Sequence, residues 1–250
     1  RDSSYFDGSL RNRQTVTRIN SNNQAIVGEN VYDNQGRSAI QILPTPVDNP
    51  ALKYFGLLNL STIGAGTNPY THLDFDWDTG ECISGAGAMD STSGAANYYR
   101  VADGGETPQG NWQDYVPSSG GFPFVQVEYT PDNTGRIRRQ SGVGETYTID
   151  GEHATEYYYL QPLQEELNRL FGYHVGNAKH YKKNLVVDAN GQVSISYIDP
   201  QGRVVATALA GGNDGETEET TKTNLISLDE HNEGTHLSAT VDLLNKLNPA

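Results

Sequence analysis

One short pattern, Asp-x-x-Gly followed by a polar residue that can open a strand, recurs along this chain. It occurs at residues 33–37, 132–136, 188–192 and 199–203. Aspartate at the first position suits a type I turn because its carboxylate accepts from the backbone ahead, and glycine at the fourth position accepts a positive φ. Segments rich in β-forming residues flank each copy, which is typical of hairpin tips. The sequence therefore predicts a mainly β chain of antiparallel hairpins.

Alternation of apolar and polar residues beside these turns predicts the strands themselves. They are expected at residues 14–19, 25–32, 38–43, 124–130, 137–140, 185–188, 193–198 and 204–209. We expect Pro44, Pro46 and Pro50 to end the third of these strands, since proline cannot donate to a ladder.

The pattern divides the chain into four segments. Residues 1–50 are expected to form a hairpin meander, and residues 51–123 an irregular glycine-rich covering segment with short strands, best placed at 70–77 and 96–101. Residues 124–212 return to hairpins, and residues 213–250 are expected to form an acidic linker and the start of a following segment.

A single short helix is predicted near residues 162–171. Pro162 suits the first helical position and Gly172 a position just beyond the end. One face carries the apolar residues Leu163, Leu167, Leu170 and Phe171. This amphipathic pattern predicts packing against a sheet.

Composition excludes several classes of function. The formal net charge of −14 disfavours nucleic acid, whose phosphates would be repelled. The chain has no apolar run long enough to span a membrane, and its single cysteine, Cys82, allows no intrachain disulfide. Because residue 1 is neither an initiator Met nor the start of a signal peptide, we expect the chain to be a piece of a longer protein.

Two of the turns carry a family resemblance. Residues 32–37 read Tyr-Asp-Asn-Gln-Gly-Arg, and residues 197–203 are a near copy with one residue inserted before the aspartate. This resembles the tyrosine–aspartate (YD) repeat of RHS proteins, and residues 5–11 resemble the opening unit of the large exported RHS-type proteins of Bacteroidetes, without the second glycine. The repeat residues are Tyr32, Asp33, Gly36, Arg37, Asp132, Gly135, Arg136, Asp188, Gly191, Tyr197, Asp199, Gly202 and Arg203.

The resemblance implies a scaffold rather than an enzyme. RHS proteins wind YD hairpins into a β-shell or spiral, and many of them enclose a C-terminal toxin. We find no segment of this sequence that resembles such a toxin. The implied partners are the rest of the same polypeptide or shell and export machinery, with no nucleic acid and no membrane span. The implied location is secreted or on the bacterial cell surface. Within the repeat, tyrosine is expected to pack on the arginine stem, which is structural chemistry and implies no substrate.

Two other groups of residues point to ligands. Asp74, Asp76 and Asp78 alternate as in the start of a calcium loop, but the glycine and final glutamate of that loop are misplaced, and the same alternation suits a strand with its carboxylates in solvent. Aromatic residues at 98, 99, 112 and 115 open the alternative of a cell-surface carbohydrate-binding or adhesive module. A basic stretch at 179–183 is expected to contact an acidic neighbouring segment.

Overall fold

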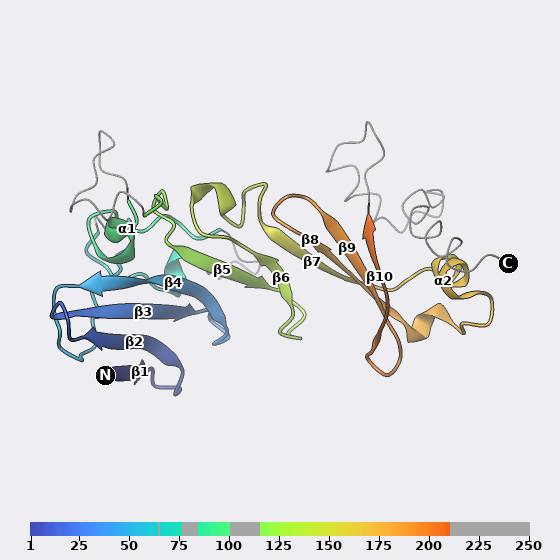
Figure 1. The fold of residues 1–250 in the computed structure, drawn as a ribbon, viewed down its shortest axis with the longest axis horizontal. Coiled ribbons are helices and arrows are strands. Elements are labelled where there is room, and N and C mark those ends of the chain that lie inside the picture. The colour runs from blue at the N-terminus through green and yellow to red at the C-terminus, as the bar shows by residue number, and fades with distance from the viewer. Residues whose placement is uncertain (65, 77–84, 101–115, 211–250) are drawn as a thin grey trace. The chain divides into compact units, whose positions relative to one another are not determined.

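The structure, a computed structural model, describes residues 1–64, 66–76, 85–100 and 116–210. It is mainly β with antiparallel strands, as the sequence predicts. The chain divides into two compact units, residues 1–154 and residues 155–250 (Figure 1). This division falls inside the segment 124–212 that the sequence suggests, and the proposed linker 213–250 lies outside the described residues.

Within its described residues, unit 1 contains six strands that neighbour one another in chain order. They are β1 (Asp2–Phe6), β2 (Asn12–Ile19), β3 (Gln24–Tyr32), β4 (Ser38–Val47), β5 (Phe124–Tyr129) and β6 (Ile137–Gln140). Every neighbouring pair is antiparallel. The turns after β1, β3 and β5 therefore lie at the same end of these strands.

Strand β4 corrects the prediction that prolines end it early. It runs through Pro44 and Pro46 to Val47, and Pro46 pairs with Ile26 of β3. The register between β3 and β4 shifts at Val27/Glu29, which marks an irregularity in the ladder beside Pro44. Proline is tolerated at such bulges because a ladder amide is already missing there.

The described residues between β4 and β5 form helical turns at the two places where strands were predicted. Instead of a strand at 70–77, the 3-10 helix η1 (His72–Asp74) begins at a capping box, in which Thr71 accepts from the backbone N–H of Leu73 and Asp74 accepts from that of Thr71. Instead of a strand at 96–101, the short helix α1 (Gly94–Tyr98) begins after Ser93. Local capping outweighs the apolar alternation at the first of these places.

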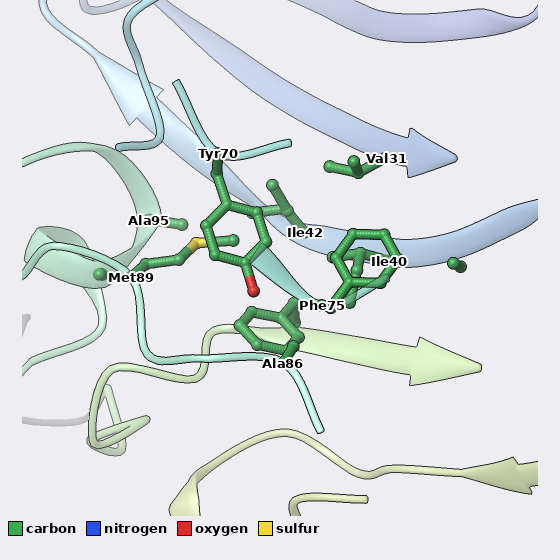
Figure 2. Packing of buried hydrophobic residues seen from close by; sticks show 11 residues of the cluster. Val31, Ile40, Ile42, Tyr70, Phe75, Ala86, Met89 and Ala95 are labelled. Atoms are coloured by element: carbon green, nitrogen blue, oxygen red, sulfur yellow. The ribbon is translucent and has the colours of Figure 1, made fainter. Parts of the chain in front are cut away.

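The core of unit 1 forms where this irregular segment packs on the sheet. Figure 2 shows Tyr70, Phe75 and Met89 beside Ile40 and Ile42 of β4, all of them almost fully buried. The Tyr70 hydroxyl donates to the carbonyl of Gly87 at 3.0 Å, which satisfies the polar end of the ring. The covering segment is therefore part of the hydrophobic core.

The described part of unit 2, residues 155–210, contains four antiparallel strands and the predicted helix. The strands are β7 (Thr155–Leu160), β8 (Lys182–Val187), β9 (Val193–Ile198) and β10 (Val204–Ala210), again in chain order. Helix α2 (Gln164–Phe171) follows β7, and the 3-10 helix η4 (Ala178–His180) precedes β8. A further 3-10 helix, η3 (Glu145–Tyr147), belongs to unit 1.

Helix α2 confirms the predicted amphipathic helix with small shifts. Leu167 and Leu170 are buried in the unit 2 core, whereas Leu163 is the N-cap and is half exposed. Gly172 ends the helix at φ +83°. From the basic stretch, Lys183 donates to Glu166 of α2 at 2.7 Å, so the expected acidic neighbour is this helix.

No helix in the part of the chain that the structure describes is long and apolar enough to cross a membrane.

Candidate functional site: the hairpin turns and the links between hairpins

The Asp33 turn shows how the repeated pattern works. Asp33 Oδ1 accepts from the backbone N–H groups of Gln35 at 3.0 Å and Arg37 at 2.8 Å. Its Oδ2 accepts from Arg37 Nε at 2.6 Å. The backbone closes with Gly36 N donating to the carbonyl of Asp33 at 2.9 Å, and Gly36 has φ +78°. This is a type I turn followed by a glycine in the left-handed conformation. The Asp33 carboxylate accepts from two backbone N–H groups of the turn and from the Arg37 side chain.

The Asp199 turn repeats this arrangement in unit 2. Asp199 Oδ1 accepts from Gln201 N and Arg203 N, both at 2.9 Å, and Oδ2 accepts from Arg203 Nε at 2.8 Å. Gly202 has φ +82° and donates to the carbonyl of Asp199 at 3.0 Å. The sequence Asp-x-x-Gly-Arg therefore builds the same turn in both units.

A further turn of this kind at Asp7 lacks the glycine. Asp7 Oδ1 accepts from Ser9 N at 2.8 Å and Arg11 N at 3.0 Å, and Oδ2 accepts from Arg11 Nε at 2.7 Å. Leu10 takes the glycine position and holds φ +60°, a strained value for a residue with a Cβ. The turn keeps its form despite the missing glycine, and the signal that reveals it is an aspartate four residues before an arginine.

The Asp188 turn has the backbone form but no arginine. Asp188 Oδ1 accepts from Asn190 N at 2.8 Å and Gln192 N at 2.9 Å, and Gly191 has φ +79°. Gln192 stands in the arginine position and donates instead to the carbonyl of Ala210 at 3.1 Å. This turn joins β8 to β9, so it lies at the other end of the strands from the Asp199 turn.

The Asp132 turn matches the pattern in sequence but differs in structure. Its closing backbone bond runs from Thr130 N to the carbonyl of Arg136 at 2.8 Å, which makes the loop longer than the Asp33 loop, closed by Asp33 N and Arg37 O. Asp132 Oδ1 accepts from the hydroxyls of Thr130 and Thr134, and Arg136 also pairs with this carboxylate. Asp132 Oδ1 also accepts from Thr134 N at 3.2 Å, so this carboxylate is shared between one backbone N–H and two threonine hydroxyls.

A lateral link joins the first two hairpins of unit 1. The guanidinium of Arg11, in the β1–β2 turn, lies over the ring of Tyr32 at 4.8 Å from its centroid. The Tyr32 hydroxyl donates to the carbonyl of Asn12, the residue after Arg11, at 2.8 Å. Tyrosine therefore packs on the arginine of the preceding hairpin and not, as the sequence suggested, on its own.

The same link joins the second hairpin to the third. Arg37 lies over the ring of Tyr129 at 4.5 Å, and the Tyr129 hydroxyl donates to the carbonyl of Ser38 at 2.8 Å. Ser38 follows Arg37 as Asn12 follows Arg11. Tyr129 immediately precedes Thr130, which closes its loop, as Tyr32 immediately precedes Asp33. We call this pair of contacts the arginine–tyrosine link.

Gly36 makes room for the first link as well as for its own turn. A Cβ at Gly36 would lie 2.2 Å from Nη1 of Arg11. A side chain there would push the guanidinium away from Tyr32. The repeat's glycine therefore serves the turn and the contact with the preceding hairpin.

Tyr197 does not make this link. One extra residue, Ile198, separates it from Asp199, and in a strand a shift of one residue moves a side chain to the other face. Tyr197 is fully buried in the unit 2 core, and its hydroxyl has no hydrogen-bond partner among the described residues. Burial, together with the nearby Glu166, raises the pKa of Tyr197 well above its usual value.

Hydrogen bonding lowers the pKa of three turn aspartates, Asp7, Asp132 and Asp199. The backbone N–H of Arg11, with that of Ser9 and the Arg11 guanidinium, lowers the pKa of Asp7 against the effect of burial. At Asp199 burial acts to raise the pKa, but the hydrogen bonds and charge of Arg203 and the N–H of Gln201 outweigh it, so the pKa falls. Donors from Thr130, Thr134 and Arg136 lower the pKa of Asp132 strongly. All three favour the ionised carboxylate that the turn needs.

Two carboxylates buried in the unit 1 sheet pair with arginines. Glu29 of β3 accepts from Asn59 at 2.7 Å and lies 3.4 Å from Arg13, while Glu128 of β5 pairs with Arg138 and Arg139. Buried charges that have partners of this kind are structural in most proteins. These pairs could not be predicted from the sequence, because the partners lie on different strands and loops.

The two described residues of the calcium pattern are occupied by protein donors. Asp74 accepts from the Ser61 hydroxyl and from Thr71 N, and Asp76 Oδ2 accepts from Asn34 N of the Asp33 turn at 2.7 Å. Asp78 lies outside the described residues. Within the described ranges no three His, Cys, Asp or Glu side chains gather as a metal site. Calcium binding stays a prediction.

Comparison with protein families gives one match. Residues 1–79 match the family model of a domain of unknown function, DUF6443. This range contains the first two hairpins and the link between them. No curated protein matches the chain. The match carries no functional description, so the RHS resemblance remains a prediction.

Proposed function

We propose that this chain is a non-catalytic scaffold segment of a large exported RHS-type protein. The observation that carries the proposal is the arginine–tyrosine link, which recurs with the same atoms between successive hairpins. A contact that repeats from hairpin to hairpin holds a sheet in register, and it needs no substrate. In an RHS-type protein such a sheet forms the wall of a shell or spiral, here presenting or enclosing an effector encoded elsewhere.

The chemistry of the turns supports a structural role. Both oxygens of Asp33 accept from its own turn, and the Arg37 guanidinium lies on Tyr129. The charged groups of the repeat are thus engaged in holding the backbone and the next hairpin. Export and a bacterial surface or secreted location are part of the same proposal and rest on the resemblance alone.

The alternative, a carbohydrate-binding or adhesive module, has weaker support. Sugar-binding aromatics present an open face, but Tyr99 donates its hydroxyl to the carbonyl of Pro44 at 2.8 Å and packs against the core of unit 1. Tyr98 stacks edge-on against Tyr99 at 4.8 Å. Trp112 and Tyr115 lie outside the described residues.

Two measurements on the whole chain separate these functions. The scaffold function predicts that the double variant Tyr32→Phe/Tyr129→Phe unfolds at a lower denaturant concentration than the wild type, because each substitution removes one hydrogen bond between hairpins. It also predicts no binding on a glycan array. Glycan binding that disappears in Tyr98→Ala would contradict the scaffold and favour the alternative, and unchanged stability of the double variant would remove the link as its basis.

A further inference from the structure

Strand β10 forms the outer edge of the unit 2 sheet within the described residues. Among the described residues no strand lies on its outer side, away from β9. Its sequence, VVATALA, contains neither charge nor proline. Val204, Val205 and Leu209 are exposed by 58%, 39% and 65%. Natural edge strands are commonly protected by charge, proline or a covering segment, so an apolar edge of this length is suited to pairing with another strand.

The turn beside this edge carries an arginine over which no aromatic ring lies among residues that the structure describes. The Asp199 turn is built as the Asp33 turn is, but the side chain of Arg203 is 74% exposed. The arginines that lie over a tyrosine are less exposed, 34% for Arg11 and 21% for Arg37. Arg203 is still oriented by Asp199, with Nη2 at 2.7 Å from Oδ2. Arg203 is thus held by its turn aspartate as Arg11 and Arg37 are, while most of its side chain is exposed.

We propose that the outer edge of β10 binds the first strand of another β-hairpin of this chain's own kind, one that ends in tyrosine immediately before its turn. The tyrosine ring lies on Arg203, and its hydroxyl donates to the carbonyl of Val204, the residue after Arg203. This inference rests on the proposed scaffold function and specifies the partner of one edge. It follows from the arginine–tyrosine link, in which the acceptor is in both cases the residue after the arginine.

The register of the two existing links defines the length of strand that fits. Continuing the β2–β3 ladder from its pair Gln14↔Glu29 places Arg11 directly across from Tyr32. Continuing the β4–β5 ladder from Ile40↔Gln126 places Arg37 directly across from Tyr129. With the same register at Arg203, all of β10 faces the residues that precede the incoming tyrosine. A strand of the length of β3, nine residues ending in Tyr32, covers it completely.

The β1 edge of a second copy fits less well. Strand β1 has five residues, and Phe6 stands in the tyrosine position immediately before Asp7. Phe6 is 58% exposed and has no hydroxyl to donate. A second copy would therefore cover only part of β10 and lack the hydrogen bond. The preferred occupant is a hairpin with a long first strand and a tyrosine.

A peptide of residues 24–47 of this chain, the β3–β4 hairpin, is the probe. Added to the full chain, it should slow hydrogen exchange across residues 204–210 and leave exchange in β1 unchanged. Tyr32→Phe in the peptide should weaken binding about fivefold, the value of roughly one hydrogen bond. Tyr32→Ala should weaken it more than about tenfold, because the contact with Arg203 is lost as well. These peptide variants leave the fold of the chain untouched.

Variants of the chain provide the matched control. Arg203→Gln should weaken binding of the peptide about threefold, while Arg169→Gln, the same charge change on the exposed side of α2, should not. The proposal would be overturned if the peptide does not bind, or if it slows hydrogen exchange elsewhere than in β10. It would also be overturned if the slowing at β10 is the same in the Tyr32 and Arg203 variants. Protection of β10 that rises with chain concentration and disappears in Phe6→Ala would assign the edge to a second copy instead. The scaffold function fails separately, through the stability of the unit 1 double variant.

Discussion

The Asp33 and Asp199 hairpins have nearly the same turn, but the tyrosine before the turn links two hairpins in the first and packs in a hydrophobic core in the second. Tyr32 lies half-buried at the end of β3, where its ring supports Arg11 and its hydroxyl reaches the neighbouring hairpin. Tyr197 is fully buried in the core of unit 2, and its hydroxyl has no partner among the described residues. One inserted residue, Ile198, separates the two outcomes.

The difference shows that two properties of the repeat are independent. The turn depends on the aspartate, the left-handed position and the arginine, all within five residues. The link depends on which face the preceding tyrosine occupies, and that is decided by its distance from the turn. A hairpin can therefore keep its turn and lose its link, as the Asp199 hairpin has done.

The largest expected effect comes from truncating the two tyrosines. Tyr197→Ala should lower the free energy of unfolding by about 3–5 kcal/mol, because it leaves a cavity in the unit 2 core. Tyr32→Ala should cost about 2 kcal/mol, the sum of one hydrogen bond and one exposed cation–π contact. Urea unfolding of each variant measures both, and equal losses would contradict the assignment of one tyrosine to the core and the other to the link.

The two turn glycines offer a second, smaller contrast. Gly36→Ala and Gly202→Ala both place a Cβ at positive φ, which costs about 1–2 kcal/mol at either position. At Gly36 the new methyl also displaces Arg11, whereas at Gly202 nothing lies within 4 Å. Gly36→Ala should therefore cost about 0.5–1 kcal/mol more. The excess should vanish in an Arg11→Ala background, and its persistence there would exclude the link as the cause.

Removing the tyrosine hydroxyls should change stability in opposite directions. Tyr32→Phe should destabilise by about 1 kcal/mol, because the carbonyl of Asn12 loses its donor. Tyr197→Phe should be neutral or stabilise by up to about 1 kcal/mol, since it removes a buried hydroxyl that has no partner. Calorimetric unfolding of the two variants compares the signs directly. Destabilisation by Tyr197→Phe would mean that its hydroxyl is hydrogen-bonded after all.

The sequence predicted the hairpins well because their information is local. Alternation identified the strands around Asp33, Asp132, Asp188 and Asp199, and the same period places Tyr32 and Tyr197 on different faces once their distance from the turn is counted. The Asp7 turn was harder to interpret, since Leu10 replaces the glycine that marks the others.

The links and the covering segment could not be predicted in this way. Arg37 and Tyr129 are far apart in sequence, and only the pairing of β4 with β5 brings them together. Residues 70–76 take their form from capping at Thr71 and from packing on β4, so their apolar spacing resembles a strand without forming one. The contacts of Asp74 with Ser61 and Thr71 likewise could not be predicted from the alternating aspartates.

The smallest expected effect is a contrast in pH dependence between the two hairpins. Glu29, in β3, has a pKa raised above 4.5 chiefly by burial, against the charge of Arg13 and the hydrogen bond from Asn59. Asp199 has a pKa below 3.8, because the donors from Arg203 and Gln201 outweigh its burial. For Glu29 the folded chain binds the proton more tightly than the unfolded chain, so its contribution to stability falls as pH rises above 4.5. For Asp199 the contribution is present above pH 3.8 and is lost as pH falls through the folded pKa.

Asp199→Asn should therefore lose stability relative to the wild type near neutral pH, and the gap should narrow on acidification below pH 3.8. Glu29→Gln should improve relative to the wild type as pH rises above 4.5, whatever constant offset its altered contacts with Arg13 introduce. Urea unfolding between pH 3 and pH 7 gives both differences. If the stability difference between variant and wild type changes with pH in the same direction for both variants, the carboxylates in the strand and in the turn are held by the same balance of burial and hydrogen bonding. Changes in opposite directions would show that the turn favours its charge and the strand tolerates its charge only through Arg13 and Asn59.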